Sequence, residues 1–192
     1  MDTVSPEQRS RMMAGIRGRD TKPEVVVRKL LFARGFRYRK NCTDLPGKPD
    51  IKLSKYHVVI LVHGCFWHGH ACRYYRIPKS NAEFWSVKID RNRQRDAHDV
   101  VALRDALWRV CIVWECVTRS IGFRSSPSFV VDKLACWIVG TEPFLELYDH
   151  DAMNTVSGAN GQERYATGIN TDADVFVAER SASYGASKID RT

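Results

Sequence analysis

The chain has 192 residues, a length that suits one domain with a hydrophobic core and falls short of two ordinary domains. Its formal net charge is +8, and residues 1–150 carry 26 Lys and Arg against 16 Asp and Glu, so we expect an anionic partner. No apolar run approaches the roughly 20 residues of a membrane span, and no secretory signal is recognisable, so we expect a cytoplasmic protein without a membrane span.

The first 20 residues predict a basic N-terminal arm. A short helix is expected to begin at Ser5, because Pro6 suits the first helical position and Gln8 can close a capping box. Arginines and two glycines make up much of the rest of this segment. Binding to an anionic partner and a solvated N-terminus are equally compatible with this composition.

The folded domain is expected to begin with a helix at Thr21. Thr21 and Glu24 have capping-box spacing, apolar residues recur on one side of the segment, and Gly35 ends it. We then expect a strand at residues 36–38, a turn at 45–49, and a hairpin of strands at 50–53 and 56–62. Asp50 therefore lies where a strand leaves a turn.

A long helix is predicted from Ser80 to about Trp108, a length of roughly 40 Å. Ser80 and Glu83 have capping-box spacing, and neither Gly nor Pro interrupts the segment. Its middle is polar, and we expect the apolar residues near its ends to pack on the core: Phe84, Val87, Val100, Leu103 and Leu107. A buried strand at 110–114 and a closing helix at 127–139 complete a mixed α/β order.

Composition changes after about residue 148, where Ser, Thr, Asn, Gly, Ala and Asp dominate. This change predicts a disordered tail. The expected organisation is an arm over residues 1–20, a domain over residues 21–148 and a tail over residues 149–192.

A segment rich in cysteine and histidine follows the hairpin. In a reducing compartment the six cysteines favour metal binding or burial over disulfides. Cys65, His70 and Cys72 lie within eight residues and could hold a tetrahedral zinc ion together with one distant cysteine. We favour Cys116 over Cys111 for that position, because Cys111 lies inside an apolar strand and Cys116 follows the strand's end.

Two further histidines and three aromatic residues accompany this segment. His63 and His68 compete for the zinc position, and neutral imidazoles also suit proton transfer near neutral pH. The surplus of histidine therefore suggests chemistry as well as structure. Phe66, Trp67 and Trp85 either stack on nucleic-acid bases or belong to the core.

Carboxylates could complete a site that hydrolyses phosphodiesters. Asp50 and the main-chain carbonyl of Val62 could converge on Mg²⁺, although a turn position alone also explains Asp50. Glu24 could point at the same ion or serve only in its capping box. In the polar helix, Asp96 or Asp99 could orient a catalytic histidine, and a solvated helix face is the alternative for both.

Four groups of residues closely resemble, in order and spacing, the very-short-patch-repair (Vsr) endonucleases: Pro-Gly-Lys-Pro-Asp50, Val-His63-Gly-Cys-Phe-Trp-His68, Glu83-Phe-Trp85 and Val113-Trp-Glu-Cys116. The similarity runs from about Ser10 to about Gly140. It implies a fold related to type II restriction endonucleases, with a mixed sheet flanked by helices and a structural zinc site. It also implies nicking of one strand of duplex DNA beside the thymine of a T:G mismatch left by deamination of 5-methylcytosine, which initiates very-short-patch repair.

The resemblance implies a role for each matching position. The zinc ligands would be Cys65, His70, Cys72 and Cys116, and Mg²⁺ would be held by Asp50 and the Val62 carbonyl. His68 would be the base, oriented by Asp96, while His63 would assist near the scissile phosphate and Glu24 would support the site. The DNA contacts would be Phe66, Trp67 and Trp85 as an aromatic wedge, Met13 on the arm, and Lys88, Asn92 and Arg119.

The implied protein is a monomer, associated with the nucleoid when bound to DNA, and other mismatch-repair proteins are further expected partners. Two alternatives rest on the residues alone. A zinc-stabilised DNA-binding module without catalysis would explain the charge and the aromatic cluster. A sequence-specific restriction-type nuclease would cut both strands, but Val62 and His63 stand where its usual acid and lysine would be.

Overall fold

The computed structural model describes Ser5, Glu7, Gln8, Arg11 and residues 18–125 and 127–149. These residues form a mixed α/β arrangement, as predicted. Its elements are α2 (Lys22–Ala33), β1 (Arg39–Lys40), β2 (Ile51–Leu53), the 3-10 helix η1 (Ser54–Tyr56), β3 (Val58–His63), α3 (Ala82–Asp105), β4 (Arg109–Trp114), α4 (Glu115–Arg119), α5 (Ile121–Ser125), α6 (Pro127–Val139) and β5 (Phe144–Leu147).

Five strands form one sheet in the order β1-β2-β3-β4-β5. The first three strands are antiparallel, and β3 pairs with β4, and β4 with β5, in parallel. The register pairs Ile51 with Ile60 and His63 with Trp114. The predicted hairpin is therefore present, and the two central buried strands end side by side at His63 and Trp114.

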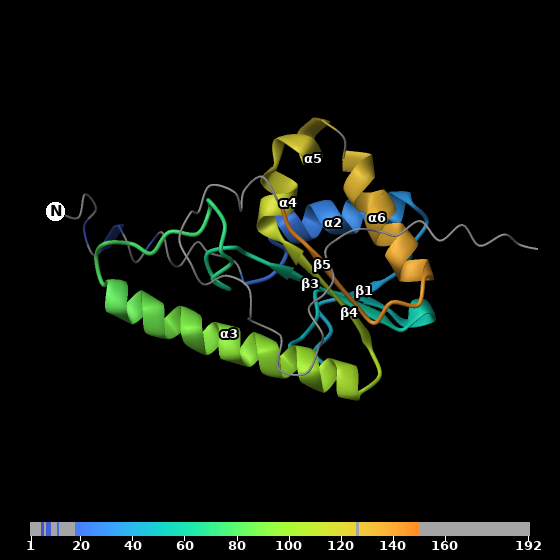
Figure 1. Cartoon of the computed structure of the whole chain (residues 1–192), viewed down its shortest axis with the longest axis horizontal. Coiled ribbons are helices and arrows are strands. Elements are labelled where there is room, and N and C mark those ends of the chain that lie inside the picture. Colours follow the sequence, from blue (N-terminus) through green and yellow to red (C-terminus); the bar gives the residue numbers. More distant parts are fainter. Residues whose placement is uncertain (1–4, 6, 9–10, 12–17, 126, 150–192) are drawn as a thin grey trace, which may run out of the picture. The chain divides into compact units, whose positions relative to one another are not determined.

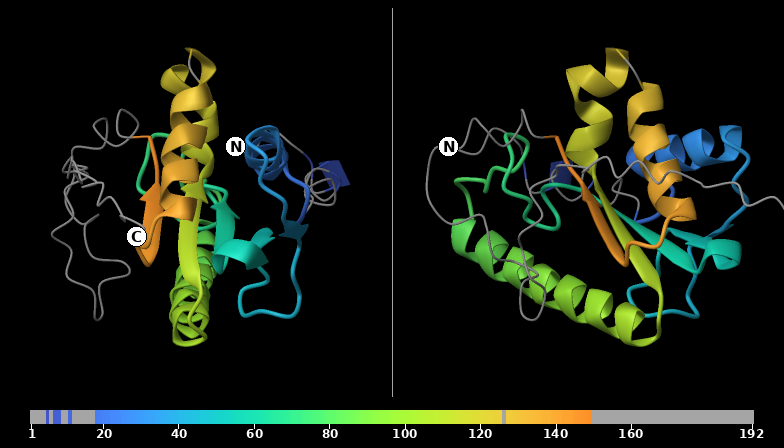
Figure 2. Two further views of the ribbon diagram at one scale, coloured as in Figure 1. Left: turned by 90° about the vertical axis from the view of Figure 1, so that its right-hand side faces the viewer. Right: turned by 45° about the vertical axis from the view of Figure 1, so that its right-hand side comes forward.

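Helices cover both faces of the sheet. Figures 1 and 2 show α3 running along one face, with α2 and α6 over the other. Alternate residues of β3 and β4, such as Ile60 and Cys111, join one core cluster with Leu31 of α2 and Leu134 of α6. The side chains between them therefore point toward α3, where Val100 and Leu103 are buried.

The predicted start of the first domain helix is confirmed. Thr21 caps α2, and both its hydroxyl and its backbone N–H donate to Glu24 Oε1, at 2.6 and 3.2 Å. Ser5 and Gln8 also exchange the contacts of the predicted N-terminal capping box. Met13, most of the arm and residues 150–192 lie outside the described residues, so the predicted limits of arm, domain and tail remain predictions.

Two strand predictions need correction. Residues 36–38 were expected to be a strand, but pairing begins only at Arg39, because Phe36 turns into the core and meets Tyr56 edge-on at 5.4 Å. The helix at 127–139 was expected to close the fold, yet β5 follows α6 and pairs with β4. Its four residues were too short a run to be recognised without the neighbouring strand.

The start and the packing of α3 also differ from expectation. Asn81, with a left-handed φ of 55°, precedes the helix and makes no side-chain cap, so the capping box predicted at Ser80 is wrong. Val100 and Leu103 are buried as expected, but three other apolar residues face solvent: Phe84, Val87 and Leu107. Composition near a helix end does not reveal which face meets the core. Among the described residues, no helix is long and apolar enough to cross a membrane.

Candidate active site and metal cluster

Sheet register brings the distant cysteine to the Cys/His segment. His63 and Trp114 are paired at the ends of parallel strands. Cys65 and Cys116 each follow two residues later, so the two chains leave the same edge of the sheet with their thiols close together. His70 and Cys72 complete a buried cluster whose ligand atoms all lie within 4.8 Å of one another. The choice of Cys116 over Cys111 therefore agrees with the geometry, since Cys111 is fully buried in β4.

The cluster has the dimensions of a tetrahedral metal site. His70 Nδ1 lies 3.8 Å from Cys65 Sγ and 3.7 Å from Cys116 Sγ. Sulfur and nitrogen ligands of one tetrahedral zinc ion, at about 2.3 and 2.1 Å from the metal, stand about 3.6 Å apart. The backbone N–H of Asp149 also lies 3.4 Å from Cys116 Sγ, as a donor to that sulfur. The donor set and its spacing thus fit zinc.

The three thiols cannot all ionise without a cation. Hydrogen bonds from Cys116 and Cys65 lower the pKa of Cys72, whereas Cys65, which donates to Cys116 and Cys72, has a raised pKa. One thiolate is thus stabilised by two neighbouring thiols. A bound divalent cation would allow the other thiols to ionise as well, so metal binding should release protons.

His68 and Asp96 form a short polar contact in the site. His68 Nδ1 lies 2.5 Å from Asp96 Oδ2, and the carboxylate side chain is only 7% exposed. Asp99, the competing candidate, instead lies 3.7 Å from exposed His98. A carboxylate on Nδ1 favours a proton on that atom and leaves the lone pair on Nε2. The structure therefore brings Asp96 to His68 in an arrangement suited to general-base chemistry.

His63 lies directly against His68. The two rings are parallel, with an interplanar angle of 3° and centroids 3.9 Å apart. Burial lowers the pKa of His63 well below its usual range, and the neighbouring His68 acts in the same direction. The ligand atoms of His63, His68 and Asp96 lie within 4.8 Å of one another, and a neutral imidazole beside a carboxylate is suited to proton transfer near neutral pH.

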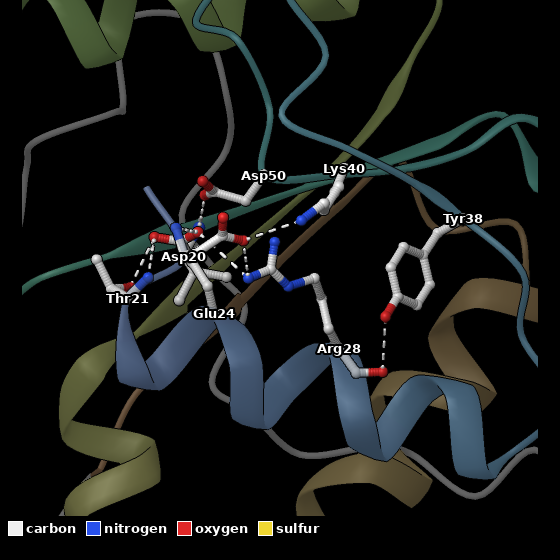
Figure 3. A network of polar contacts seen from close by, with 8 residues as sticks. Asp20, Thr21, Glu24, Arg28, Tyr38, Lys40 and Asp50 are labelled. Atoms are coloured by element: carbon white, nitrogen blue, oxygen red, sulfur yellow. Dashed lines mark hydrogen bonds and ion pairs between the residues drawn. The ribbon is translucent and has the colours of Figure 1, made fainter. Parts of the chain in front are cut away.

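Asp50 and Glu24 lie near each other above the start of α2, as Figure 3 shows, and the charge of His68 acts on Asp50. Asp50 Oδ2 accepts the backbone N–H of Val62 at 2.7 Å. Burial, and to a smaller extent the Glu24 carboxylate, raise the pKa of Asp50 to about 6, although the hydrogen bond from Val62 acts in the opposite direction. The buried Glu24 accepts from Thr21 and, at 2.9 Å, from the backbone N–H of Asp20, and it lies 3.8 Å from Arg28.

Glu24 is thus fully engaged by protein donors, and Asp50 is the better placed of the two to hold a cation. A hard carboxylate oxygen near a main-chain carbonyl is a donor set that suits Mg²⁺, which usually keeps several waters and substrate oxygens as its other ligands. The Asp50 carboxylate fits Mg²⁺ by this chemistry, whereas Glu24 does not offer a free oxygen for it.

The aromatic residues form one cluster next to the histidines. Phe66, Trp67 and Trp85 meet edge-on, with centroids 5.2 to 5.9 Å apart, and each remains partly exposed. Lys88 Nζ stands 5.4 Å from the Trp85 ring and 5.6 Å from the Trp67 ring. The cluster therefore belongs to the surface beside the site rather than to the core.

The other expected DNA-contacting residues differ in surroundings. Asn92 Nδ2 donates to the main-chain oxygen of Trp67 at 2.8 Å, so its amide is already engaged within the protein. Arg119 lies over the Tyr74 ring at 4.2 Å and pairs with Glu115 at 3.2 Å. Lys88 and Asn92 lie on the same outer face of α3 as Arg91 and Arg95.

Some residues of the site were missed by sequence analysis. Trp114 stacks on His70 at 4.2 Å and meets His63 edge-on at 5.3 Å, while its indole N–H donates to Glu146 of β5 at 2.5 Å. It therefore links the Cys/His cluster to the histidine pair. The β3–β4 register places Trp114 opposite His63 and therefore at the site. This register cannot be read from the sequence until the two strands are known to pair. Arg93 was also missed, because it lies in the polar middle of α3, which was interpreted as a solvent-exposed face.

Comparisons with known proteins point to one family. The family described as DNA mismatch endonuclease Vsr matches residues 1–74. The type II nicking enzyme V.XorIIP of Xanthomonas oryzae pv. oryzae is 46% identical over 121 residues, which cover 63% of this chain and 89% of the relative. The type II nicking enzyme V.NmeAIP of Neisseria meningitidis is 50% identical over 119 residues, covering 62% and 85%. The DNA mismatch endonuclease Vsr of Escherichia coli is 39% identical over 139 residues, covering 72% and 88%.

Proposed function

The chain belongs to the Vsr DNA mismatch endonuclease family, and we propose that it nicks one strand of duplex DNA beside the thymine of a T:G mismatch. Such a mismatch arises when 5-methylcytosine is deaminated, and the nick would initiate very-short-patch repair. The observation that carries the proposal is the His68–Asp96 pair, stacked on His63 and adjoining the Asp50 carboxylate.

In this proposal His68 removes a proton from the attacking water. Asp96 holds the proton on His68 Nδ1, so Nε2 accepts the proton of the water and Asp96 stabilises the imidazolium that results. His63 stays neutral because it is buried. It limits the mobility of the His68 ring by stacking and assists near the scissile phosphate.

Asp50 and the carbonyl of Val62 would hold Mg²⁺, which when bound would neutralise charge on the phosphate and polarise its phosphorus–oxygen bonds. The Val62 N–H fixes the Asp50 carboxylate at 2.7 Å, and this orients it toward the end of β3. Glu24 supports the site indirectly, since its two oxygens tie the start of α2 and the end of the arm beside Asp50.

A structural zinc ion would be bound by Cys65, His70, Cys72 and Cys116. It would connect the loop after β3 to α4 and thereby fix the segment that carries His68. The mixed sheet with helices on both faces is compatible with a fold related to type II restriction endonucleases. In this proposal the domain spans residues 21–148, between the basic arm and the C-terminal tail.

Phe66, Trp67 and Trp85 would enter the base stack beside the mismatch, where unstacking costs least. Met13 on the arm would reach the same step from the minor groove. Lys88, Asn92 and Arg119 would contact the flanking DNA, with Asn92 also holding Trp67. We propose a monomer as the active form, with other mismatch-repair proteins as further partners.

The test uses a T:G duplex labelled separately on each strand and incubated with the protein and Mg²⁺. We expect nicking of the thymine strand alone, no nicking with EDTA, and loss of nicking in Asp50→Ala. Nicking that is unchanged in Asp50→Ala would contradict the proposed site.

A second candidate follows from the relatives named type II nicking enzymes. Under that reading, the protein nicks one strand at a fixed sequence in perfectly paired DNA. A T:A duplex of the same sequence separates the two candidates, because only the second predicts equal nicking. Binding without any nick would instead indicate a zinc-stabilised DNA-binding module.

A further inference from the structure

Three consecutive residues of the loop after β3 are each bonded to α3. The contacts are Asn92 Nδ2 to the Trp67 carbonyl oxygen at 2.8 Å, Asp96 Oδ2 to His68 Nδ1 at 2.5 Å, and Arg93 Nη2 to the Gly69 carbonyl oxygen at 2.5 Å. Positions 92 and 96 are one helical turn apart and position 93 adjoins them, so one helix face holds the whole segment. Of these three α3 residues, only Arg93 has no role in the proposed function.

Gly69 and Arg93 fit each other closely. Gly69 has a φ of +64°, a left-handed conformation that favours glycine. A Cβ at this position would stand 2.3 Å from Arg93 Nε and 2.6 Å from Arg93 Cζ, so the guanidinium lies flat against the Gly69 backbone. Any larger residue at position 69 would displace the arginine.

The surroundings of Arg93 indicate a structural partner rather than a DNA phosphate. Its Nη1 pairs with Asp90 at 3.2 Å, and its Cζ lies 5.6 Å from the centre of the Tyr75 ring. Only 26% of its side chain is exposed. A charged donor to a main-chain oxygen makes a stronger hydrogen bond than a neutral donor, so this contact is well suited to fixing a peptide plane.

The bond from Arg93 to the Gly69 carbonyl affects the proposed catalytic base, because of where Gly69 lies in the chain. Gly69 lies between His68, the proposed base, and His70, a proposed zinc ligand. A bound zinc ion would hold the chain at His70, whose N–H also donates to the Cys65 carbonyl at 2.9 Å, and Arg93 holds the Gly69 carbonyl of the same peptide from the side of α3. We propose that Arg93 is a positioning residue, which locks the Gly69 peptide against α3 and so holds His68 on Asp96. This proposal rests on the proposed function of His68.

Arg93→Met tests the proposal, because it keeps most of the side-chain stem and removes every donor. Arg104→Met, in the last turn of the same helix, is the matched control. We expect Arg93→Met to lower kcat about 10- to 100-fold, as misplacement of a catalytic group does. KM for the T:G duplex should stay within about threefold, and zinc content should be unchanged. A raised KM with unchanged kcat would mean that Arg93 contacts DNA, and would overturn the proposal.

A double-mutant cycle with Gly69→Ala sharpens the test. The added Cβ should displace the guanidinium, so the single variant should also lose kcat. The double variant should then fall within about threefold of Arg93→Met alone, whereas independent effects would multiply. Multiplied effects would contradict a shared cause.

Hydrogen exchange separates this proposal from the proposed function. The amides of His68 and Gly69 bond to Gly64 and Phe66 carbonyls, at 3.1 and 3.3 Å. In Arg93→Met they should exchange at least about tenfold faster than in the wild type, and in Arg104→Met they should not. Wild-type protein that nicks no duplex would refute the function but leave this readout intact. Unchanged exchange in Arg93→Met would overturn the positioning role whatever the activity.

Discussion

His68 Nδ1 and Asp96 Oδ2 lie 2.5 Å apart, although 28 positions separate the two residues in the chain. The loop after β3 carries the imidazole, and the middle of α3 carries the carboxylate. Polar residues in the middle of a long helix usually face solvent, yet Asp96 is buried. The polar middle of α3, which was expected to face solvent, therefore lines one side of the candidate active site.

Asp96→Asn should lower kcat for nicking by about 10² to 10⁴, because an amide can hold the imidazole in the wrong tautomer. KM should change little, since Asp96 is buried and its carboxylate is bonded to His68. Steady-state nicking at a series of T:G duplex concentrations measures both constants. Asp99→Asn is the control and should retain activity, because Asp99 lies beside the exposed His98 and not beside His68. Equal loss in both variants would argue against a specific role for Asp96.

Cys116→Ser should lower both the zinc content and the thermal stability of the protein. Removing one of four buried ligands leaves a site that holds zinc weakly, and folding loses the contribution of the metal. We expect less than half of the wild-type zinc after dialysis and a Tm lower by more than about 10 °C. Metal analysis and thermal unfolding provide the measurements. Cys136→Ser, at an exposed cysteine of α6, should change neither quantity.

Asp50→Asn should raise the Tm at pH 8 without divalent cations, by roughly 2–6 °C, while abolishing nicking. Burial raises the pKa of Asp50 to about 6 in the folded protein, so its charged form disfavours folding above that pH. As pH falls from about 6 toward 4, the folded wild type takes up the proton first and gains stability. The advantage of the variant should therefore shrink over this range.

Asp44→Asn is the contrasting control for that measurement. Lys52, at 2.6 Å, lowers the pKa of Asp44, so the charged form favours folding and its neutralisation should not raise the Tm. A Tm that falls in Asp50→Asn at pH 8 would show that the Asp50 carboxylate is not under electrostatic strain.

Trp67→Ala should weaken binding to a T:G duplex more than binding to a T:A duplex. Stacking of a base on an aromatic ring contributes about 1–3 kcal/mol, which corresponds to a loss of roughly 5- to 150-fold in affinity. Fluorescence anisotropy with a catalytically inactive background would measure it. Phe129→Ala removes an exposed aromatic ring of α6 and should bind like the parent. Equal weakening for both duplexes would exclude a wedge at the mismatch.

Local signals in the sequence predicted a good part of the fold. The Thr21 and Glu24 pair marks the start of α2, and the apolar run at Val58 marks a central strand. These features depend on neighbours within a few residues. By contrast, β5 depends on β4 for its existence, and the exposed faces of Phe84 and Val87 depend on where α3 meets the sheet. Contacts of this kind are not encoded in short segments.

The candidate site divides in the same way. Residue types and spacing predicted that Cys65, His70 and Cys72 could share a metal, and the parallel register explains why Cys116 joins them. Arg93 could not be found from its own segment, because it is one of several arginines on a polar helix. The feature of the sequence that could have indicated such a contact was Gly69, because a glycine between two histidines permits close approach of another side chain.

We propose that this protein nicks DNA at a mismatch with His68 as the base. The most direct measurement mixes equimolar T:G and T:A duplexes, with distinct labels on all four strands, and follows nicking by wild type and His68→Ala in the presence of Mg²⁺. We predict a nick only in the thymine strand of the T:G duplex, and a loss of at least about 100-fold in His68→Ala. Equal nicking of the T:A duplex, or full activity in His68→Ala, would contradict the account.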